Sequence, residues 1–256
     1  MTRPLHIGLL GAMPEEIGSD LEHLQNLEQS RYGDLTVSQG QWSTAKGDPV
    51  LISLAWSGWG KVSAARAATR LLASASSEAP IDLLLFTGVA GAADAELQQW
   101  DVLLASAVVQ HDMDARPLCP RFSLPALQRD RLIPQPHWLN WAAAALEQAQ
   151  ASGHLTGFGK LDQGLIGTGD QFIGEASRLD ELRSALPGLK AVEMEGASMA
   201  QVAEQEGVPW LVLRVISDGA DESAAQTFSD FVQAYDKRAW QLIEALLTQV
   251  NLAPRP

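Results

Sequence analysis

Cysteine is almost absent from this sequence. Cys119 is the one cysteine among 256 residues, which excludes an internal disulfide bond and a zinc site built from cysteines. It lies between prolines in the segment RPLCPRF, without a histidine close by in the chain. We therefore interpret Cys119 as a structural thiol and not as a nucleophile.

Long apolar runs are missing as well. No uncharged apolar segment reaches the roughly 18 residues that a membrane-spanning helix needs. The N-terminal segment MTRPLHIGLLGAMPEE has an apolar run that is too short, and too soon acidic, for a signal peptide. These observations predict a cytoplasmic protein that does not bind a membrane.

Positive charge is scarce. The chain has 18 Lys and Arg residues against 31 Asp and Glu residues, which gives a formal net charge of -13. The cations are scattered along the sequence, whereas a surface for nucleic acid needs clustered Lys and Arg. We expect no nucleic-acid partner.

What the chain does contain is typical of a globular α/β protein. Apolar residues make up 46% of the sequence and charged residues 19%. We find no internal repeat, linker or low-complexity segment, so residues 1–256 are expected to form a single domain with a sizeable core. Apolar runs of strand length alternate with helical patterns, which predicts an α/β fold.

The pattern predicts the following elements. Strands are expected at Leu5–Ala12, Leu35–Trp42, Pro49–Trp56, Ile81–Phe86, Trp100–Val109, Lys160–Gly169 and Trp210–Ile216, with a short one ending at Glu193. Helices are expected at 62–75, Trp138–Ala149, Glu175–Ser184, between the last two strands, and at Phe228–Val250. Residues 87–93 are interpreted as a glycine-rich turn and 115–135 as a long surface excursion.

Carboxylates follow several of these strands. Glu16 comes soon after the first strand, Glu193 and Glu195 end the short strand, and Asp218 follows the last one. In open α/β sheets, ligands bind at the carboxyl ends of the strands. Each acid alone could be a helix cap or a partner of a helix dipole. Taken together, we interpret them as a catalytic group.

Common cofactors find little support. In the segment around Ser57 to Lys61, Ala55 and Val62 replace residues that a phosphate-binding Walker loop requires, and the third glycine of a dinucleotide fingerprint is missing. The segment HDMD at 111–114 could suggest a metal, but neighbouring strand residues point to opposite faces and no second cluster has ligand spacing. We expect neither a cofactor nor a metal.

Five motifs in order carry a resemblance to a known family. GAMPEE, TGVAGA, GDQFI, AVEMEGAS and LRVISDGAD occur as they do in nucleoside phosphorylases and nucleosidases. From Ile7 to the last helix, the chain resembles the bacterial 5'-methylthioadenosine/S-adenosylhomocysteine nucleosidases. The resemblance implies a single three-layer α/β/α domain with a central mixed, partly barrel-like sheet, assembled as a homodimer. It also implies a nucleoside substrate, whose N-glycosidic bond is hydrolysed to release adenine.

The resemblance assigns the acid and the base of that reaction. Asp218, beside Ser217, matches the general acid that protonates the departing purine, and Glu16 matches the base that activates water. An aspartic acid of ordinary pKa cannot donate a proton at neutral pH, so burial should raise the pKa of Asp218. Arg214 is expected to orient the water and the carboxylates.

The remaining roles concern substrate binding. Glu195 matches the residue that binds the ribose hydroxyls. The other implied contacts are Met194 under the sugar with Glu193 nearby, Phe172 and the Ile173 backbone at adenine, Phe228 and Leu104 of the partner subunit at the 5'-alkylthio group, and His111 at the subunit boundary.

Two positions depart from the family pattern. Val89 replaces a small hydroxyl residue on the water and ribose side, and Trp59 replaces a smaller aliphatic residue near the 5' group. Val89 also removes a phosphate ligand, and 85–87 lacks the arginine of phosphorylases, so hydrolysis is favoured over phosphorolysis. The alternatives are a hydrolase of futalosine or aminofutalosine, a phosphorylase, and a catalytically silent nucleoside-binding relative.

Overall fold

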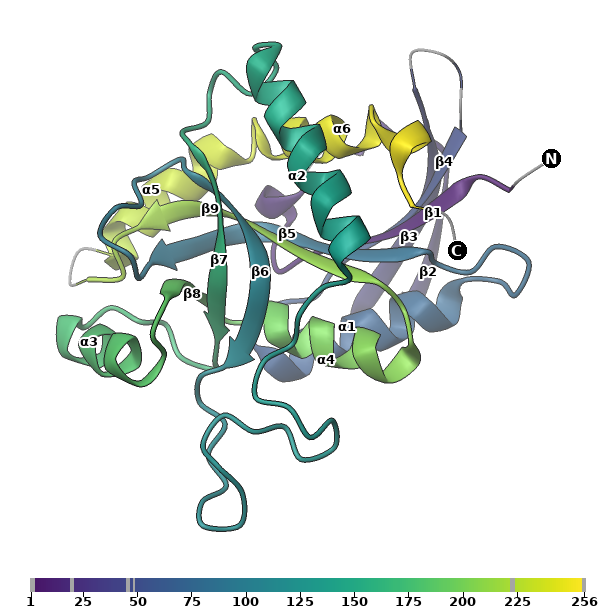
Figure 1. Cartoon of the computed structure of the whole chain (residues 1–256). Helices are drawn as coiled ribbons and strands as arrows, with labels where there is room; N and C mark the ends of the chain where they lie inside the picture. Colours follow the sequence, from purple (N-terminus) through teal and green to yellow (C-terminus); the bar gives the residue numbers. More distant parts are fainter. Residues whose placement is uncertain (1–2, 19–20, 45–46, 48, 222–223, 255–256) are drawn as a thin grey trace.

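A mixed sheet, partly closed into a barrel, is the centre of the fold (Figure 1). The computed structural model describes all residues except 1–2, 19–20, 45–46, 48, 222–223 and 255–256. Within these described residues the sheet has nine strands in the order β2-β3-β4-β1-β5-β8-β7-β6-β9. Because β5 also pairs with β9, the last five strands in this order form a closed ring.

The strands are formed mainly by runs that are apolar along their whole length. Their bounds are β1 (Leu5–Gly11), β2 (Gln25–Tyr32), β3 (Leu35–Ser43), β4 (Pro49–Trp56), β5 (Leu83–Ala92), β6 (Val102–Gln110), β7 (Leu161–Thr168), β8 (Leu189–Glu193) and β9 (Trp210–Asp218). Every residue of β1 and β9 is buried, as expected for strands covered on both faces.

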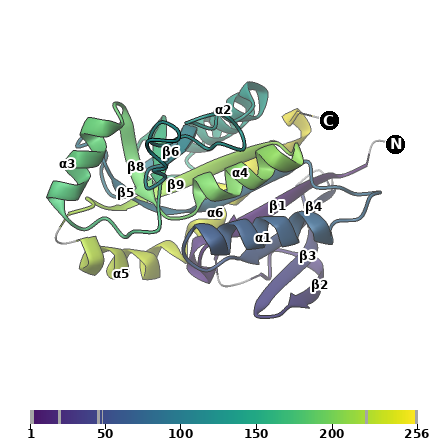
Figure 2. The same cartoon turned by 90° about the horizontal axis from the view of Figure 1, so that it is seen from below.

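Helices cover both faces of the sheet (Figures 1 and 2). Their bounds are α1 (Lys61–Ser74), α2 (Pro136–Ala151), α3 (Ala176–Ala185), α4 (Gly196–Glu206), α5 (Ala224–Tyr235) and α6 (Ala239–Leu247), with short 3-10 turns at η1 (Pro14–Glu16) and η2 (Val250–Leu252). One core cluster joins the sheet to α1 and α4, and another joins it to α2, α5 and α6. The expected three-layer α/β fold with a partly barrel-like sheet is confirmed. None of the helices in the described part of the chain is both long and apolar enough to cross a membrane.

The direction of β8 differs from what an open parallel sheet would give. Strands β1, β4, β5 and β9 run parallel, whereas β8 pairs antiparallel with β5. Closure of the barrel explains how β8 and β9 nevertheless bring their carboxyl ends together. Gly91 of β5 pairs with Val192 on one side and with Asp218 on the other.

The glycine-rich segment 87–93 is not a turn, and that prediction was wrong. Strand β5 continues through Thr87 to Ala92, because this stretch pairs first with β9 and then with β8. Its pairing with β9 shifts between Ala90 and Gly91, where an irregularity interrupts the ladder. The glycines therefore lie within the barrel wall itself.

Two further differences concern the ends of the chain. Strand β2 was not predicted, because its sequence QNLEQSRY is polar and it pairs at the edge of the sheet with β3 alone. The single helix predicted at Phe228–Val250 is two helices, α5 and α6. Arg238, at the break, donates a hydrogen bond of 2.8 Å to the Gly157 carbonyl and lies over the Trp100 ring. These tertiary contacts override the continuous helical pattern.

Most other predicted elements are confirmed to within a few residues. The excursion at 115–135 contains neither helix nor regular strand, and all of it is described; two isolated bridges, Val108 to Leu132 and Leu124 to Arg129, tie it down.

Candidate active site

A cavity of about 390 Å³ lies where β1, β5, β8 and β9 meet. Most of the predicted site residues line it: Glu16, Trp59, Val89, Phe172, Ile173, Glu193, Met194, Glu195, Ser217, Asp218 and Phe228. They come from segments that are far apart in the sequence, and the closed sheet brings them together. The wall combines four carboxylates with apolar and aromatic side chains.

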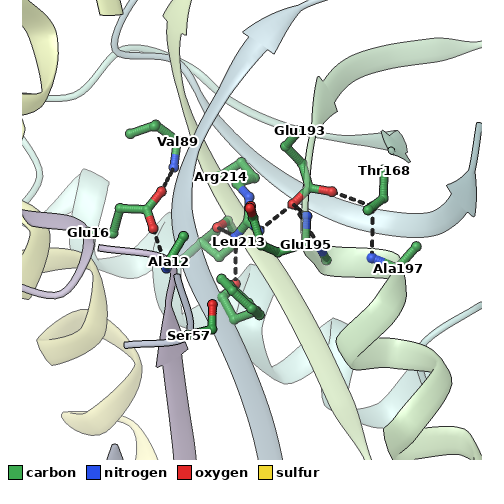
Figure 3. Close-up of polar contacts among 12 residues, drawn as sticks. Ala12, Glu16, Ser57, Val89, Thr168, Glu193, Glu195, Ala197, Leu213 and Arg214 are labelled. Atoms are coloured by element: carbon green, nitrogen blue, oxygen red, sulfur yellow. Dashed lines mark hydrogen bonds and ion pairs between the residues drawn. The ribbon is translucent and has the colours of Figure 1, made fainter. Parts of the chain in front are cut away.

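Glu16 is held rigidly at the point where β1 ends (Figure 3). Its Oε2 accepts hydrogen bonds from the backbone N–H groups of Ala12 (2.5 Å) and Met13 (3.2 Å), and its Oε1 accepts one from Val89 (3.0 Å). A side chain at Gly88 would overlap this carboxylate, so position 88 has to be glycine. Burial raises the pKa of Glu16, although Arg214 and the three amides oppose the rise.

Glu193 is an ion-paired carboxylate in the cavity wall (Figure 3). Its Oε2 accepts a hydrogen bond of 2.5 Å from Arg214 Nη2, and both side chains are almost fully buried. The same oxygen accepts from the amides of Glu195 and Gly196, and Oε1 accepts from the Thr168 hydroxyl. These bonds fix the turn from β8 into α4, from which Glu195 projects.

The Glu195 carboxyl group accepts fewer hydrogen bonds than that of Glu193, and its pKa is shifted. Its Oε1 accepts one hydrogen bond, of 2.8 Å, from the Gly60 amide. Burial, together with the charges of Glu193 and Glu16, raises the pKa of Glu195 to about 8. Arg214 is the one cation that opposes these effects. The Glu195 carboxyl group therefore binds a proton more readily than an ordinary glutamate.

The raised pKa of Glu195 predicts how the stability of the protein depends on pH. The unfolded chain should bind a proton at Glu195 with the ordinary value of 4.5, so between pH 4.5 and 8 the folded chain holds more protons than the unfolded one. The free energy of unfolding should therefore fall as pH rises through this window, by at most about 1.4 kcal/mol per pH unit. Glu195→Gln should flatten that slope in urea unfolding measured from pH 5 to 8. Glu15→Gln, at a half-buried carboxylate outside the cavity wall, is the control; an unchanged slope in Glu195→Gln would contradict the assignment.

Asp218 lies at the end of β9 with a different environment. Its Oδ2 accepts a hydrogen bond of 2.6 Å from the Ser217 hydroxyl, and its Oδ1 accepts one of 2.9 Å from the Ala220 amide. Burial raises its pKa, while the two hydrogen bonds hold it down. The carboxyl group thus has a fixed orientation and an increased affinity for a proton.

Aromatic side chains form the more exposed part of the cavity wall. Phe172 and Phe228 meet edge to face, with ring centroids 6.0 Å apart. Phe172 is 51% exposed and Trp59 61%, so both rings offer open surface to a ligand. Gly58 and Gly60, on either side of Trp59, have positive φ angles of 78° and 91°, a backbone conformation that favours glycine.

Three predicted residues do not line this cavity. Arg214 is fully buried behind it, and its Nη1 donates to the carbonyls of Phe86 and Leu213, so it acts through Glu193. Leu104 is 3% exposed, lies in the core beside α2, and has little surface to offer a partner subunit. His111 is completely buried against Gly167 and Gly169, which corrects its predicted place at a subunit boundary; burial lowers its pKa.

Sequence reasoning missed several neighbours of the predicted residues. Met13, Gln171 and Ser229 line the cavity, next to Glu16, Phe172 and Phe228 in space or in sequence. Their closeness to motif residues in the sequence could have predicted their place in the site. No sequence signal marked the Thr168 hydroxyl and the Gly60 amide, which bind Glu193 and Glu195. Among the described residues no group of three His, Cys, Asp or Glu side chains is placed to hold a metal ion.

Comparison with known proteins identifies the family. The sequence profile of the Phosphorylase superfamily matches residues 6–248. The 5'-methylthioadenosine/S-adenosylhomocysteine nucleosidase of Chromohalobacter salexigens is 30% identical over 249 residues, which cover 96% of this chain and 98% of that protein.

Solved structures agree with the sequence comparison. The nucleosidase of the same name from Colwellia psychrerythraea, in complex with adenine, superimposes with a TM-score of 0.84 at 30% identity, covering 97% of this chain and 96% of the other. The futalosine hydrolase of Helicobacter pylori gives 0.79 at 30% identity, covering 95% and 97%. The chain therefore belongs to the Phosphorylase superfamily and, within it, to the family of 5'-methylthioadenosine/S-adenosylhomocysteine nucleosidases.

Proposed function

We propose that this chain is a purine nucleosidase that hydrolyses 5'-methylthioadenosine and S-adenosylhomocysteine and releases adenine. The observation that carries the proposal is the gathering of Glu16, Glu195 and Asp218 around one cavity with an aromatic wall. Cleavage of an N-glycosidic bond builds positive charge on the ribose and negative charge on the base. Carboxylates near the sugar and a proton donor near the purine stabilise both changes.

Asp218 supplies the proton to the purine. As the bond between C1' and the purine nitrogen breaks, its electron pair moves into the base, and the Asp218 proton neutralises it. The buried position of Asp218 favours its protonated form before the reaction. Ser217 and the Ala220 amide keep the carboxyl group in one orientation.

Glu16 accepts the proton of the attacking water. The water oxygen forms the new bond to C1', and the products are adenine and the thioribose. Because three backbone amides fix the Glu16 carboxylate, the base needs no rearrangement when the water loses its proton. Glu195 binds the ribose hydroxyls, and the positive charge that develops on the sugar favours the ionised form of both glutamates.

Water is the better nucleophile for this cavity than phosphate. No lysine, arginine or histidine occurs among the described residues of the cavity wall, and Val89 offers an apolar side chain there. A phosphate dianion would meet Glu16 and Glu195 without a cation to neutralise it. We therefore expect phosphate to leave the rate unchanged.

The proposal is tested by an assay that measures release of the purine base from methylthioadenosine, S-adenosylhomocysteine, deoxyadenosine and futalosine-type substrates, each with and without phosphate. The expected result is release from the first two that does not depend on phosphate. No release from methylthioadenosine would refute the proposal. Release that requires phosphate would make the chain a phosphorylase, and binding without release of any base would make it a silent relative.

Hydrolysis of futalosine or its amino analogue is the second candidate. The structural likeness to the futalosine hydrolase of Helicobacter pylori favours it. The same assay separates the two, because it compares kcat/KM for both substrate classes side by side.

Trp59 gives a prediction about the 5' substituent. The indole lines the cavity together with Phe228, Met13 and Ser229, and its bulk should favour the small methylthio group over the longer homocysteine chain. Trp59→Leu should raise the kcat/KM of S-adenosylhomocysteine relative to methylthioadenosine by about tenfold. Trp56→Leu, outside the cavity wall, is the control for loss of a tryptophan; an unchanged ratio in Trp59→Leu would show that the indole does not set this preference.

We further propose that the protein is a cytoplasmic homodimer of single-domain subunits. Its composition favours the cytoplasm. The exposed apolar side chains of Leu118 and Ile133 (91% and 62% exposed) on the excursion support a subunit interface there. Analytical ultracentrifugation of the wild type and of Leu118→Asp tests it, since the substitution should shift the dimer toward monomer.

A further inference from the structure

The first turn of α1 connects two sides of the proposed active site. At its beginning, the Gly60 N–H donates a buried hydrogen bond of 2.8 Å to Glu195 Oε1. One residue later, the Lys61 N–H donates one of 2.7 Å to Asp170 Oδ1. Two neighbouring amides of one helix start thus bind two carboxylates from different segments, one of which lines the cavity.

A second set of bonds closes this connection. Lys61 Nζ donates to Asp112 Oδ1 at 2.7 Å, and the Asp170 amide donates to Asp112 Oδ2 at 2.9 Å. Asp112 therefore bridges the Lys61 side chain and the Asp170 backbone. On the other side, the Ser198 hydroxyl of α4 donates to the Lys61 carbonyl at 2.6 Å.

The approach of Asp170 to the helix start is close. A Cβ atom on Gly60 would lie 2.9 Å from Asp170 Oδ1, and Gly60 has a φ of 91°, so this position requires glycine on both counts. Phe172 follows Asp170 by two residues and lines the cavity. The aromatic ring and Glu195 are thus linked by Asp170, Lys61 and Gly60.

We propose that Asp170 is a positioning residue, which holds the Gly60–Lys61 peptide against Glu195 and so couples the Phe172 side of the cavity to the carboxylate that binds the sugar. This inference rests on the proposed nucleosidase function. Asp170 does not line the cavity, so its effect on the substrate passes through Glu195 and Phe172.

The charge of Glu195 provides a specific readout. The Gly60 amide lowers the pKa of Glu195, against the raising effects of burial, Glu193 and Glu16, and alongside the lowering effect of Arg214. If Asp170 no longer holds the peptide, this hydrogen bond weakens and the pKa rises further. Because ionised Glu195 accepts the ribose hydroxyls, the acidic limb of kcat/KM should move to higher pH.

The experiment compares Asp170→Ala with Asp170→Asn in the full chain. The alanine variant loses the acceptor for the Lys61 amide, so KM for methylthioadenosine should rise about tenfold, as for loss of a hydrogen bond to a charged group, with a smaller change in kcat. The acidic limb should move up by about half to one pH unit. The asparagine variant keeps an oxygen at Oδ1 and should restore most of both properties.

Asp94→Asn is the matched control. It removes the charge of an aspartate that pairs with Lys190 at 2.6 Å, and neither residue lines the cavity. Its KM and pH profile should equal those of the wild type. If Asp170→Ala keeps the wild-type KM and pH limb, or lowers only the unfolding temperature, the positioning role is refuted. An inactive wild type would instead refute the proposed function, so the two failures are distinguishable.

Discussion

Asp218→Asn should lower kcat for adenine release from methylthioadenosine by about 10²- to 10⁴-fold, the usual contribution of a positioned general acid. Asparagine has nearly the same shape: its oxygen can still accept from the Ala220 amide, and its NH₂ group can donate to the Ser217 hydroxyl, which then donates to the Ala90 carbonyl alone. It carries no acidic proton, however, so the purine must leave as an anion. KM should change much less, because the substitution removes little volume from the cavity.

The leaving group separates this role from a purely structural one. p-Nitrophenolate leaves without protonation, so the p-nitrophenyl glycoside of 5-methylthioribose should be hydrolysed by Asp218→Asn at close to the wild-type rate. Steady-state rates on both substrates make the comparison. An equal loss on both would mean that Asp218 supports the structure of the site or the sugar, and not the base.

Glu16→Gln should lower kcat by a similar factor, about 10²- to 10⁴-fold, but on both substrates, because each needs an activated water. It should also cost stability. All three partners of the Glu16 carboxylate are N–H donors, so the amide NH₂ of glutamine must face at least one of them. A lost hydrogen bond of this kind costs roughly 1–3 kcal/mol.

The control for Glu16→Gln lies next to it. Glu15 is in the same 3-10 turn but makes no part of the cavity wall, so Glu15→Gln should keep both the wild-type rate and the wild-type unfolding midpoint. Urea unfolding shows whether Glu16→Gln is folded under assay conditions. A folded Glu16→Gln with wild-type kcat would exclude Glu16 as the base.

Patterns along the chain were sufficient to predict the described strands except β2, and the carboxylates that follow them. Glu16, Glu195 and Asp218 stand in short motifs after apolar runs, and the sheet brings these strand ends together. The direction of each strand was harder to predict, since nothing in a buried apolar run tells whether β8 runs parallel or antiparallel to β5. That choice depends on closure of the barrel, which is a property of the whole sheet.

Other details depended on contacts that the sequence does not reveal. The family resemblance implied that Arg214 orients the water and the carboxylates, but only its burial and its pairing with Glu193 show that it lies behind the wall. Strand β2 has no apolar alternation, because it lies at the edge of the sheet with most of its side chains exposed. The break between α5 and α6 follows from what Arg238 contacts, and a helical pattern cannot register it.

Glu16 also completes the sheet. Strand β1 pairs with β5 only as far as Leu10 and Phe86, so Val89, which pairs with Val215 of β9 on its other side, has no strand on the β1 side. The Glu16 carboxylate accepts from the Val89 amide and fills the space that a side chain at residue 88 would need. On this side of β5, the carboxylate takes the place of a neighbouring strand. The position of the base is therefore set by the spacing between strands, and a mutation that moves β1 relative to β5 should impair water activation even when it lies far from the cavity.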